Sequence, residues 1–174
     1  MTLFEYKGVR PTIGKECYIA DSAEVIGDVH LGDGCYVGPG AVIRGDYGRI
    51  RVGNRTAVEE LVMIHARPGE EAKVGSDVTL GHGAIIHTPK EIADFAVIGM
   101  GAIISDWAVV GEWAAIGEGA VVKNKQEIPT RAIAVGIPAK VIGEVDEKYM
   151  EMWKRFKQIY VDLARNNKRD LKRI

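Results

Sequence analysis

Three of the four histidines in this sequence have the chemistry and the spacing to bind a metal ion. They are His65, His82 and His87, whereas His30, at a predicted turn, is expected to be ordinary surface. Three neutral imidazoles with an open fourth position describe a catalytic zinc site. Such a metal lowers the pKa of a bound water to about 7 and supplies hydroxide as a nucleophile. Whether the three rings can meet depends on the elements that carry them.

A six-residue repeat runs through most of the chain. Aliphatic residues recur at every sixth position in three runs, Ile13–Ile43, Val52–Ile64 and Val74–Ile128, with a small residue usually four positions after each. An α-helix, with its period of 3.6, cannot produce this pattern, and glycine recurs too often for ordinary strands. Short strands that wind into stacked coils bury one aliphatic side chain each and build a continuous core. The sequence therefore predicts an all-β fold, a parallel β-helix of hexapeptide repeats over residues 1–143.

Hexapeptide repeats of this kind resemble the left-handed β-helix, which has a triangular cross-section and three hexads in each coil. The pattern ends near Gly143, and residues 144–174 carry apolar residues at near-helical spacing with charges between them. They predict a C-terminal amphipathic α-helix packed on the β-helix or on a neighbour, with Asp146 as its N-cap. Cys17 and Cys35 lie three hexads apart at small positions, so we expect them to stack as core residues.

Three hexads make one coil, so the repeat places the histidines relative to one another. His65 and His87 follow aliphatic residues three hexads apart, and they therefore occupy the same slot in adjacent coils, roughly 5 Å apart. This holds if residues 66–73 bulge outward as a loop. Arg44 lies one coil below in the same column. His82 lies on the preceding face, so it can join the other two rings only from a neighbouring chain, as in a cyclic trimer.

At this point the residues resemble the γ-class carbonic anhydrase family. The matching segments are Arg44–Asp46, Ile64–His65, Gly81–His87 and Ile98–Ala102, and the stretch Val135–Lys140 is shared more widely among hexapeptide-repeat proteins. The resemblance implies a homotrimer with one metal site at each interface, where His65, His82 and His87 bind zinc, or iron or cobalt. It also implies an ion pair between Arg44 and Asp46 across the interface, and zinc-hydroxide hydration of CO2 to bicarbonate.

The chain departs from the family pattern around the predicted metal. The family commonly has Gln six residues before the first histidine ligand, where this chain has Glu59, and the prototype has Glu where this chain has Tyr47. Glu59 and Tyr47 are therefore the candidate catalytic residues. Glu59 could accept a hydrogen bond from the metal-bound water, act as a base, or be an ordinary charged residue. The long loop that carries an acidic proton shuttle in the family is short here, and Glu70 and Glu71 are the candidates for that role.

Two other functions are compatible with the sequence. The missing Gln and the altered acidic residues fit a metal-binding trimer that catalyses weakly and serves as an assembly or binding module. Many hexapeptide-repeat proteins are acyltransferases that use an acyl-CoA, with one histidine at a subunit boundary as general base and no metal. Three clustered histidines argue against this interpretation, so we rank the carbonic anhydrase first, the module second and the acyltransferase third.

Composition and charge limit the classes of partner. The 23 basic and 24 acidic residues nearly cancel, at a net charge of −1, which gives no electrostatic reason to expect nucleic acid or an anionic membrane. No apolar run is long enough to span a bilayer, and the N-terminus lacks the layout of a signal peptide. We therefore expect a cytoplasmic protein whose partners are its own copies and a small-molecule substrate, CO2 or bicarbonate.

Overall fold

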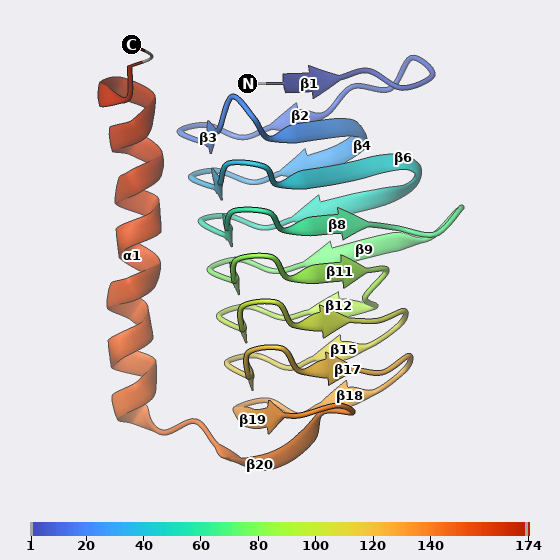
Figure 1. The fold of residues 1–174 in the computed structure, drawn as a ribbon, viewed down its shortest axis with the longest axis vertical. Coiled ribbons are helices and arrows are strands. Elements are labelled where there is room, and N and C mark those ends of the chain that lie inside the picture. The colour runs from blue at the N-terminus through green and yellow to red at the C-terminus, as the bar shows by residue number, and fades with distance from the viewer. Residues whose placement is uncertain (1, 173) are drawn as a thin grey trace.

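The computed structural model describes residues 2–172 and 174. The described chain winds into stacked coils of short strands, and one long helix runs back along the stack, so that both chain ends lie at the same end (Figure 1). The coils form a left-handed parallel β-helix whose strands build the three walls of a prism. The fold predicted from the six-residue repeat is confirmed.

Two walls share one twelve-stranded sheet, because β6 (Val42–Val52) bends at the edge between them. The first half of β6 pairs with β8 and the second half with β9. The other strands of the first wall are β1 (Thr2–Phe4), β8 (Met63–His65), β11 (Ile85–His87), β14 (Ile103–Ile104) and β17 (Val121–Val122). Those of the second wall are β2 (Thr12–Ile13), β9 (Glu71–Val74), β12 (Glu91–Ile92), β15 (Val109–Val110) and β18 (Glu127–Ile128). β4 (Glu24–Leu31) spans both walls, as β6 does.

The third wall is an eight-stranded sheet that faces the helix. Its strands are β3 (Tyr18–Ile19), β5 (Tyr36–Val37), β7 (Ala57–Val58), β10 (Thr79–Leu80), β13 (Val97–Ile98), β16 (Ala115–Ile116), β19 (Ala132–Val135) and β20 (Lys140–Glu144). Neighbours pair in parallel except for β19 and β20, which close the last coil as an antiparallel pair. Partners in regular coils lie 18 residues apart, as Leu80 and Ile98 do, so one coil is three hexads.

The core consists of aliphatic columns stacked inside the prism. One fully buried column contains Ile43, Ile64, Ile86, Ile104 and Val122. Burial of each such side chain stabilises the fold by about 1.5–3 kcal/mol. Small residues let the coils approach closely, and a Cβ added at Gly81 would lie 2.8 Å from the carbonyl oxygen of Ile98. Cys17 and Cys35 are both buried in this core, as predicted.

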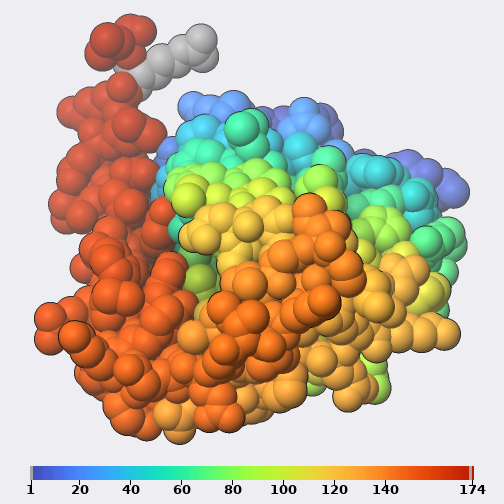
Figure 2. All heavy atoms as spheres, turned by 60° about the horizontal axis from the view of Figure 1, so that its bottom comes forward, coloured from blue at the N-terminus to red at the C-terminus, as the bar shows by residue number. Residues whose placement is uncertain are grey.

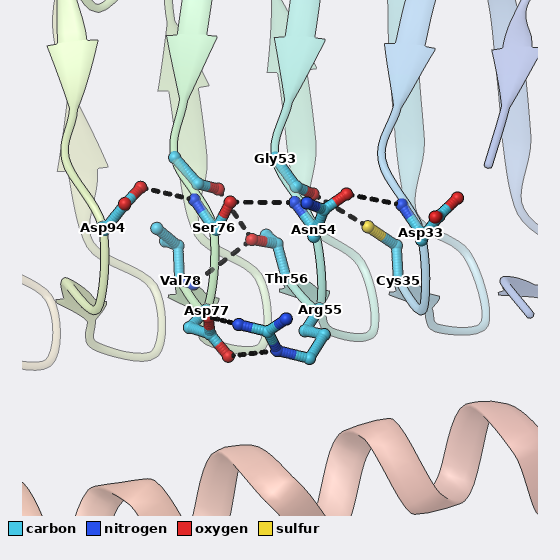
Figure 3. A network of polar contacts seen from close by, with 11 residues as sticks. Asp33, Cys35, Gly53, Asn54, Arg55, Thr56, Ser76, Asp77, Val78 and Asp94 are labelled. Carbon is cyan, nitrogen blue, oxygen red and sulfur yellow. Dashed lines mark hydrogen bonds and ion pairs between the residues drawn. The ribbon is translucent and has the colours of Figure 1, made fainter. Parts of the chain in front are cut away.

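Polar side chains stack along one edge of the prism, where the coils turn. Asn54 Oδ1 accepts from the Asp33 N–H at 2.8 Å, and Ser76 Oγ accepts from the Asn54 N–H at 3.1 Å (Figure 3). Asp94 continues this ladder, with Oδ1 accepting from the Ser76 N–H at 2.7 Å. Each side chain satisfies a backbone donor of the previous coil that would otherwise lack a protein partner. The ladder therefore holds successive coils in register.

Helix α1 (Glu147–Asp170) packs on the third wall of its own chain. This is one of the two arrangements that the sequence left open, the other being packing on a neighbouring chain. Asp146 caps the helix as predicted, because its Oδ1 accepts from a first-turn N–H at 2.7 Å. Tyr160 packs edge-on against Tyr36 with ring centroids 5.2 Å apart. Figure 2, in which the end of the prism that carries β20 comes forward, shows the helix lying along one side of the β-helix. Within the described residues, no helix is long and apolar enough to cross a membrane.

Candidate metal centre

The first wall brings two histidines together, as the repeat predicts. His65 ends β8 and His87 ends β11, and the two residues are direct partners in the parallel pairing of these strands. Their ring centroids are 5.5 Å apart. Arg44 occupies the same column one coil earlier, opposite His65. The extra residues between 66 and 73 leave the coil unchanged, because the isoleucines before both histidines also pair directly.

His87 is held by a buried carboxylate. Its Nδ1 donates to Asp106 Oδ1 at 2.7 Å, and Arg67 donates to the other oxygen, Oδ2, at 2.8 Å. Burial acts to raise the pKa of Asp106, but the hydrogen bonds from Arg67 and His87 outweigh it and hold the pKa below its ordinary value. Because an ionised carboxylate only accepts, the proton of a neutral His87 ring lies on Nδ1 and leaves Nε2 with a lone pair.

His65 is the more buried ring of the pair, and it meets a different acidic group. Its Nε2 lies 3.0 Å from Asp46 Oδ1, while Arg44 donates to Asp46 Oδ2 at 2.5 Å. The Tyr47 ring packs edge-on against His65, with centroids 4.8 Å apart. Burial lowers the pKa of His65 although Asp46 opposes the shift, which favours the neutral ring that a metal needs. Arg44 and Asp46 pair with each other in the single chain, and their pairing across an interface stays a prediction.

His82 lies on the turn between β10 and β11, between two glutamates. Its Nε2 is 3.1 Å from Glu59 Oε2, and its Nδ1 is 2.6 Å from Glu60 Oε2. The ring borders a cavity of about 570 Å³ between the third wall and aromatic residues of α1. In the described part of one chain, no group of three or more His, Cys, Asp or Glu side chains could hold a metal ion. His82 therefore does not complete a site with His65 and His87 of its own chain.

Glu59 is a buried carboxylate rather than an ordinary solvated charge. Only 5% of the residue is exposed, and its Oε2 accepts from the His82 N–H at 3.1 Å. Burial raises the pKa of Glu59, and a hydrogen bond with Tyr160 of the helix opposes this shift. Glu59 thus lies beside one of the predicted ligands, while its catalytic role stays a prediction.

The remaining candidates lie at the surface. Tyr47 is about half exposed at the rim of the histidine pair. Glu70 and Glu71 are exposed, and Glu71 Oε2 lies 3.8 Å from Arg49 Nε and 3.9 Å from Arg51 Nε on the second wall. These contacts direct Glu71 toward arginines and not toward the histidine column. A substrate contact for Tyr47 and proton transfer by either glutamate stay predictions.

Sequence reasoning missed Asp106, Arg67 and Glu60. Asp106 lies 19 residues after His87, one coil and one position further on, so the repeat that placed the histidines could also have found it. Arg67 lies in the irregular segment between two coils, where the repeat defines no position. Glu60 adjoins Glu59 at an outward position, which periodicity alone does not distinguish from ordinary surface.

The first wall of one chain supplies two of the three imidazoles that the predicted zinc site needs. His87 offers an open Nε2, and His65 offers a ring that burial keeps neutral, once its Nε2 leaves Asp46. Imidazole nitrogens suit zinc and also iron and cobalt. A third imidazole has to come from another chain, and His82, on the turn between β10 and β11, is the candidate.

Comparison with known proteins defines the class of the protein first. Residues 10–45 match the family "Bacterial transferase hexapeptide (six repeats)". The crystal structure of a Bacillus cereus protein, provisionally described as an acetyltransferase, superposes with a TM-score of 0.93 at 35% identity over 96% of both chains. The repeat and the fold together define a hexapeptide-repeat β-helix protein.

Curated relatives then define the family. A "Probable carbonic anhydrase" of Methanocaldococcus jannaschii is 41% identical over 152 residues, which cover 87% of this chain and 95% of that protein. "Gamma carbonic anhydrase 2, mitochondrial" of Arabidopsis thaliana is 34% identical over 94% of this chain, which spans 60% of the length of that protein. A "Carnitine operon protein CaiE" of a Proteus species is also 34% identical, over 94% of this chain and 83% of that protein. The chain belongs to the γ-class carbonic anhydrase family.

Proposed function

We propose that the protein is a carbonic anhydrase-like lyase, a homotrimer that hydrates CO2 to bicarbonate at metal sites shared by neighbouring chains. The observation that carries this proposal is the direct stacking of His65 and His87, with ring centroids 5.5 Å apart on one wall. In the proposed site these two residues and His82 of the partner subunit would hold zinc, or alternatively iron or cobalt. When bound, such a metal supplies an activated water for attack on CO2.

An apolar column on the same wall supports the presence of a second chain there. Residues alternate in direction along a strand, so the neighbours of the buried isoleucines point away from the core. The outward residues of five successive coils are all apolar: Val42, Met63, Ile85, Ile103 and Val121. Ile85 is 43% exposed. Contiguous apolar surface marks an interaction site, and a copy of the same chain is the partner that cyclic symmetry provides.

Two residues near the proposed site would serve the reaction directly. Glu59 would accept a proton at Oε2, because it is a buried carboxylate beside His82 and burial raises its pKa. Glu59 lies next to His82 of the same chain. The partner subunit that contributes His82 to a site would therefore contribute Glu59 as well. Tyr47, half exposed beside His65, would line the entrance for the substrate.

Metal analysis, assembly and activity together test this function. Metal-loaded protein should be a trimer of 19.0 kDa chains and should hydrate CO2. The H87A variant should lose both the metal and the activity, because one of the two stacked imidazoles is gone. The H30A variant is the matched control, since His30 lies outside the pair, on strand β4 and not at the turn that the sequence predicted, and it should keep both. CO2 hydration by H87A at the wild-type rate, or a monomeric protein in solution, would contradict the proposal.

A metal-binding trimer with little catalysis is the second candidate. Both ring nitrogens of His82 lie within 3.1 Å of carboxylate oxygens, and Glu59 occupies the position where the family commonly has Gln. This function predicts bound metal with no CO2 hydration at any pH. The likeness to the Bacillus cereus protein motivates a third function, acyl transfer from an acyl-CoA. Turnover of an acyl-CoA by metal-free protein would favour that function.

A further inference from the structure

We propose that Asp106, itself held by Arg67, sets the tautomer of His87 and so determines that Nε2 is the nitrogen offered to a metal. Asp106 is then a positioning residue, since it acts through His87 and does not touch substrate or metal. The inference rests on the proposed function for the role of His87 as a ligand. The contacts that support it all belong to a single chain.

The contact between His87 and Asp106 determines where one proton lies. Nδ1 and Oδ1 are 2.7 Å apart, which is the length of a charge-assisted hydrogen bond. An ionised carboxylate has no proton to give, so Nδ1 must be the donor. A neutral imidazole carries a single N–H, and Nε2 therefore keeps its lone pair. Metal-binding histidines are commonly oriented in this way, by a hydrogen bond at the nitrogen that does not bind the metal.

Asp106 has little freedom to turn away from His87. Its side chain is 6% exposed, and Arg67 Nη2 donates to its second oxygen at 2.8 Å. Arg67 is itself anchored, because its backbone N–H donates to Thr88 Oγ1 at 2.9 Å and its guanidinium lies 5.6 Å from the centroid of the Trp107 ring. Each carboxylate oxygen thus has its own donor, and rotation of the carboxylate would break both contacts. A buried group held on two sides keeps the ring of His87 pre-organised.

His65 shows that the neighbouring ring is held in the opposite way. Its Nε2 faces Asp46 at 3.0 Å, so the nitrogen engaged on His65 is the one that stays open on His87. His87 can therefore bind a metal without rearrangement, whereas His65 must first exchange its contact with Asp46. The support that Asp106 gives is thus specific to one of the two stacked rings.

The substitution Asp106→Asn tests this most sharply, because it keeps the size of the side chain and removes its charge. Arg67 can only donate, so the amide oxygen should face Arg67 and the amide N–H should face His87. The His87 proton should then move to Nε2. Long-range proton–nitrogen NMR spectra of the metal-free protein report the tautomer, with H87A used to assign the signals. Competition with a chelating indicator measures the affinity for zinc.

We expect the Nδ1–H tautomer in the wild type, the Nε2–H tautomer in D106N, and a zinc affinity lowered by about 10- to 100-fold in that variant. The double variant D106N/R67L should recover part of the affinity, because its amide is free to turn its oxygen to His87. The matched control is Asp77→Asn, since Asp77 also pairs with an arginine, Arg55, on another part of the prism (Figure 3). The control should change neither the tautomer nor the zinc affinity.

Two results would overturn the role of Asp106. One is an unchanged His87 tautomer in D106N, and the other is a zinc affinity within about twofold of the wild-type value. If the wild-type protein binds no zinc, iron or cobalt while the tautomer still changes in D106N, the proposed function fails but Asp106 still sets the His87 proton. The NMR measurement therefore separates a failure of this inference from a failure of the proposed function.

Discussion

Replacing Lys157 by Met should stabilise the protein, and the gain should shrink as the pH rises. Lys157 lies between α1 and the third wall, with 4% of its surface exposed. Its Nζ donates to two uncharged acceptors, Thr79 Oγ1 at 3.1 Å and the Ala96 carbonyl oxygen at 3.4 Å. Burial lowers the pKa of Lys157 to about 7, although the charges of Asp77 and Glu59 oppose the shift.

The sign and size of the effect follow from proton binding. The unfolded chain keeps Lys157 protonated up to about pH 10.5, whereas the folded protein releases this proton above about pH 7. The unfolded state binds more protons between these values, so this contribution to stability rises with pH across that window. At pH 7.5 the buried amine costs the native state about 4 kcal/mol, at 1.36 kcal/mol per pKa unit. Met keeps the apolar stem and loses two hydrogen bonds worth about 1 kcal/mol each, which leaves a net gain of about 2 kcal/mol.

Urea unfolding of wild type and K157M at one protein concentration measures this gain. The difference in unfolding free energy should be about 2 kcal/mol at pH 7.5 and close to zero at pH 9.5, where most of the cost has disappeared. K154M is the matched control, because Lys154 is exposed on the same helix and pairs with Glu151 at 2.6 Å, and it should be nearly neutral at both pH values. A K157M protein that is less stable than wild type by the same amount at both pH values would refute the reasoning.

Three further predictions concern assembly, catalysis and the packing of coils. Ile85→Asp places a charge in the outward apolar column and should convert trimer to monomer in light scattering, and an unchanged trimer would place the interface elsewhere. Glu59→Ala removes the proposed base without introducing the Gln that the family commonly has there, so CO2 hydration should fall at least about tenfold at constant metal content. An undiminished rate would exclude Glu59 as the base. Gly81→Ala brings a Cβ to 2.8 Å from the Ile98 carbonyl oxygen and should lower the unfolding free energy in a denaturation experiment by more than about 2 kcal/mol.

The fold and the histidine pair could be predicted because a six-residue period fixes both the direction in which a side chain points and the coil in which it lies. Every sixth aliphatic residue points inward, so Ile64 and Ile86 had to stack once three hexads were taken as one coil. The residues that follow them, His65 and His87, then share a column whatever the length of the loop between them. The same count separated His82 from this column, and the structure has it on the turn between β10 and β11.

The rest of the site depends on contacts between segments that the repeat does not relate. The burial of Glu59 depends on which surface the C-terminal helix covers, and the sequence left open whether that surface belongs to its own chain or a neighbour. Arg67 lies in an irregular segment, so its contact with Asp106 had no expected position. The proton on His87 depends on that contact, and no pattern of residue types along the chain indicates it.

The direct pairing of β8 with β11 has a consequence for how this protein can change. Backbone pairing between strands sets the distance from one coil to the next. The separation of His65 and His87 is therefore fixed by the number of hexads between them. Deleting one hexad between them would carry His87 to the adjacent wall and separate the pair at once. Lengthening the loop after His65 would leave the two rings in place. Variation can therefore accumulate freely in such loops, whereas inserting or deleting hexads between the two histidines separates the pair.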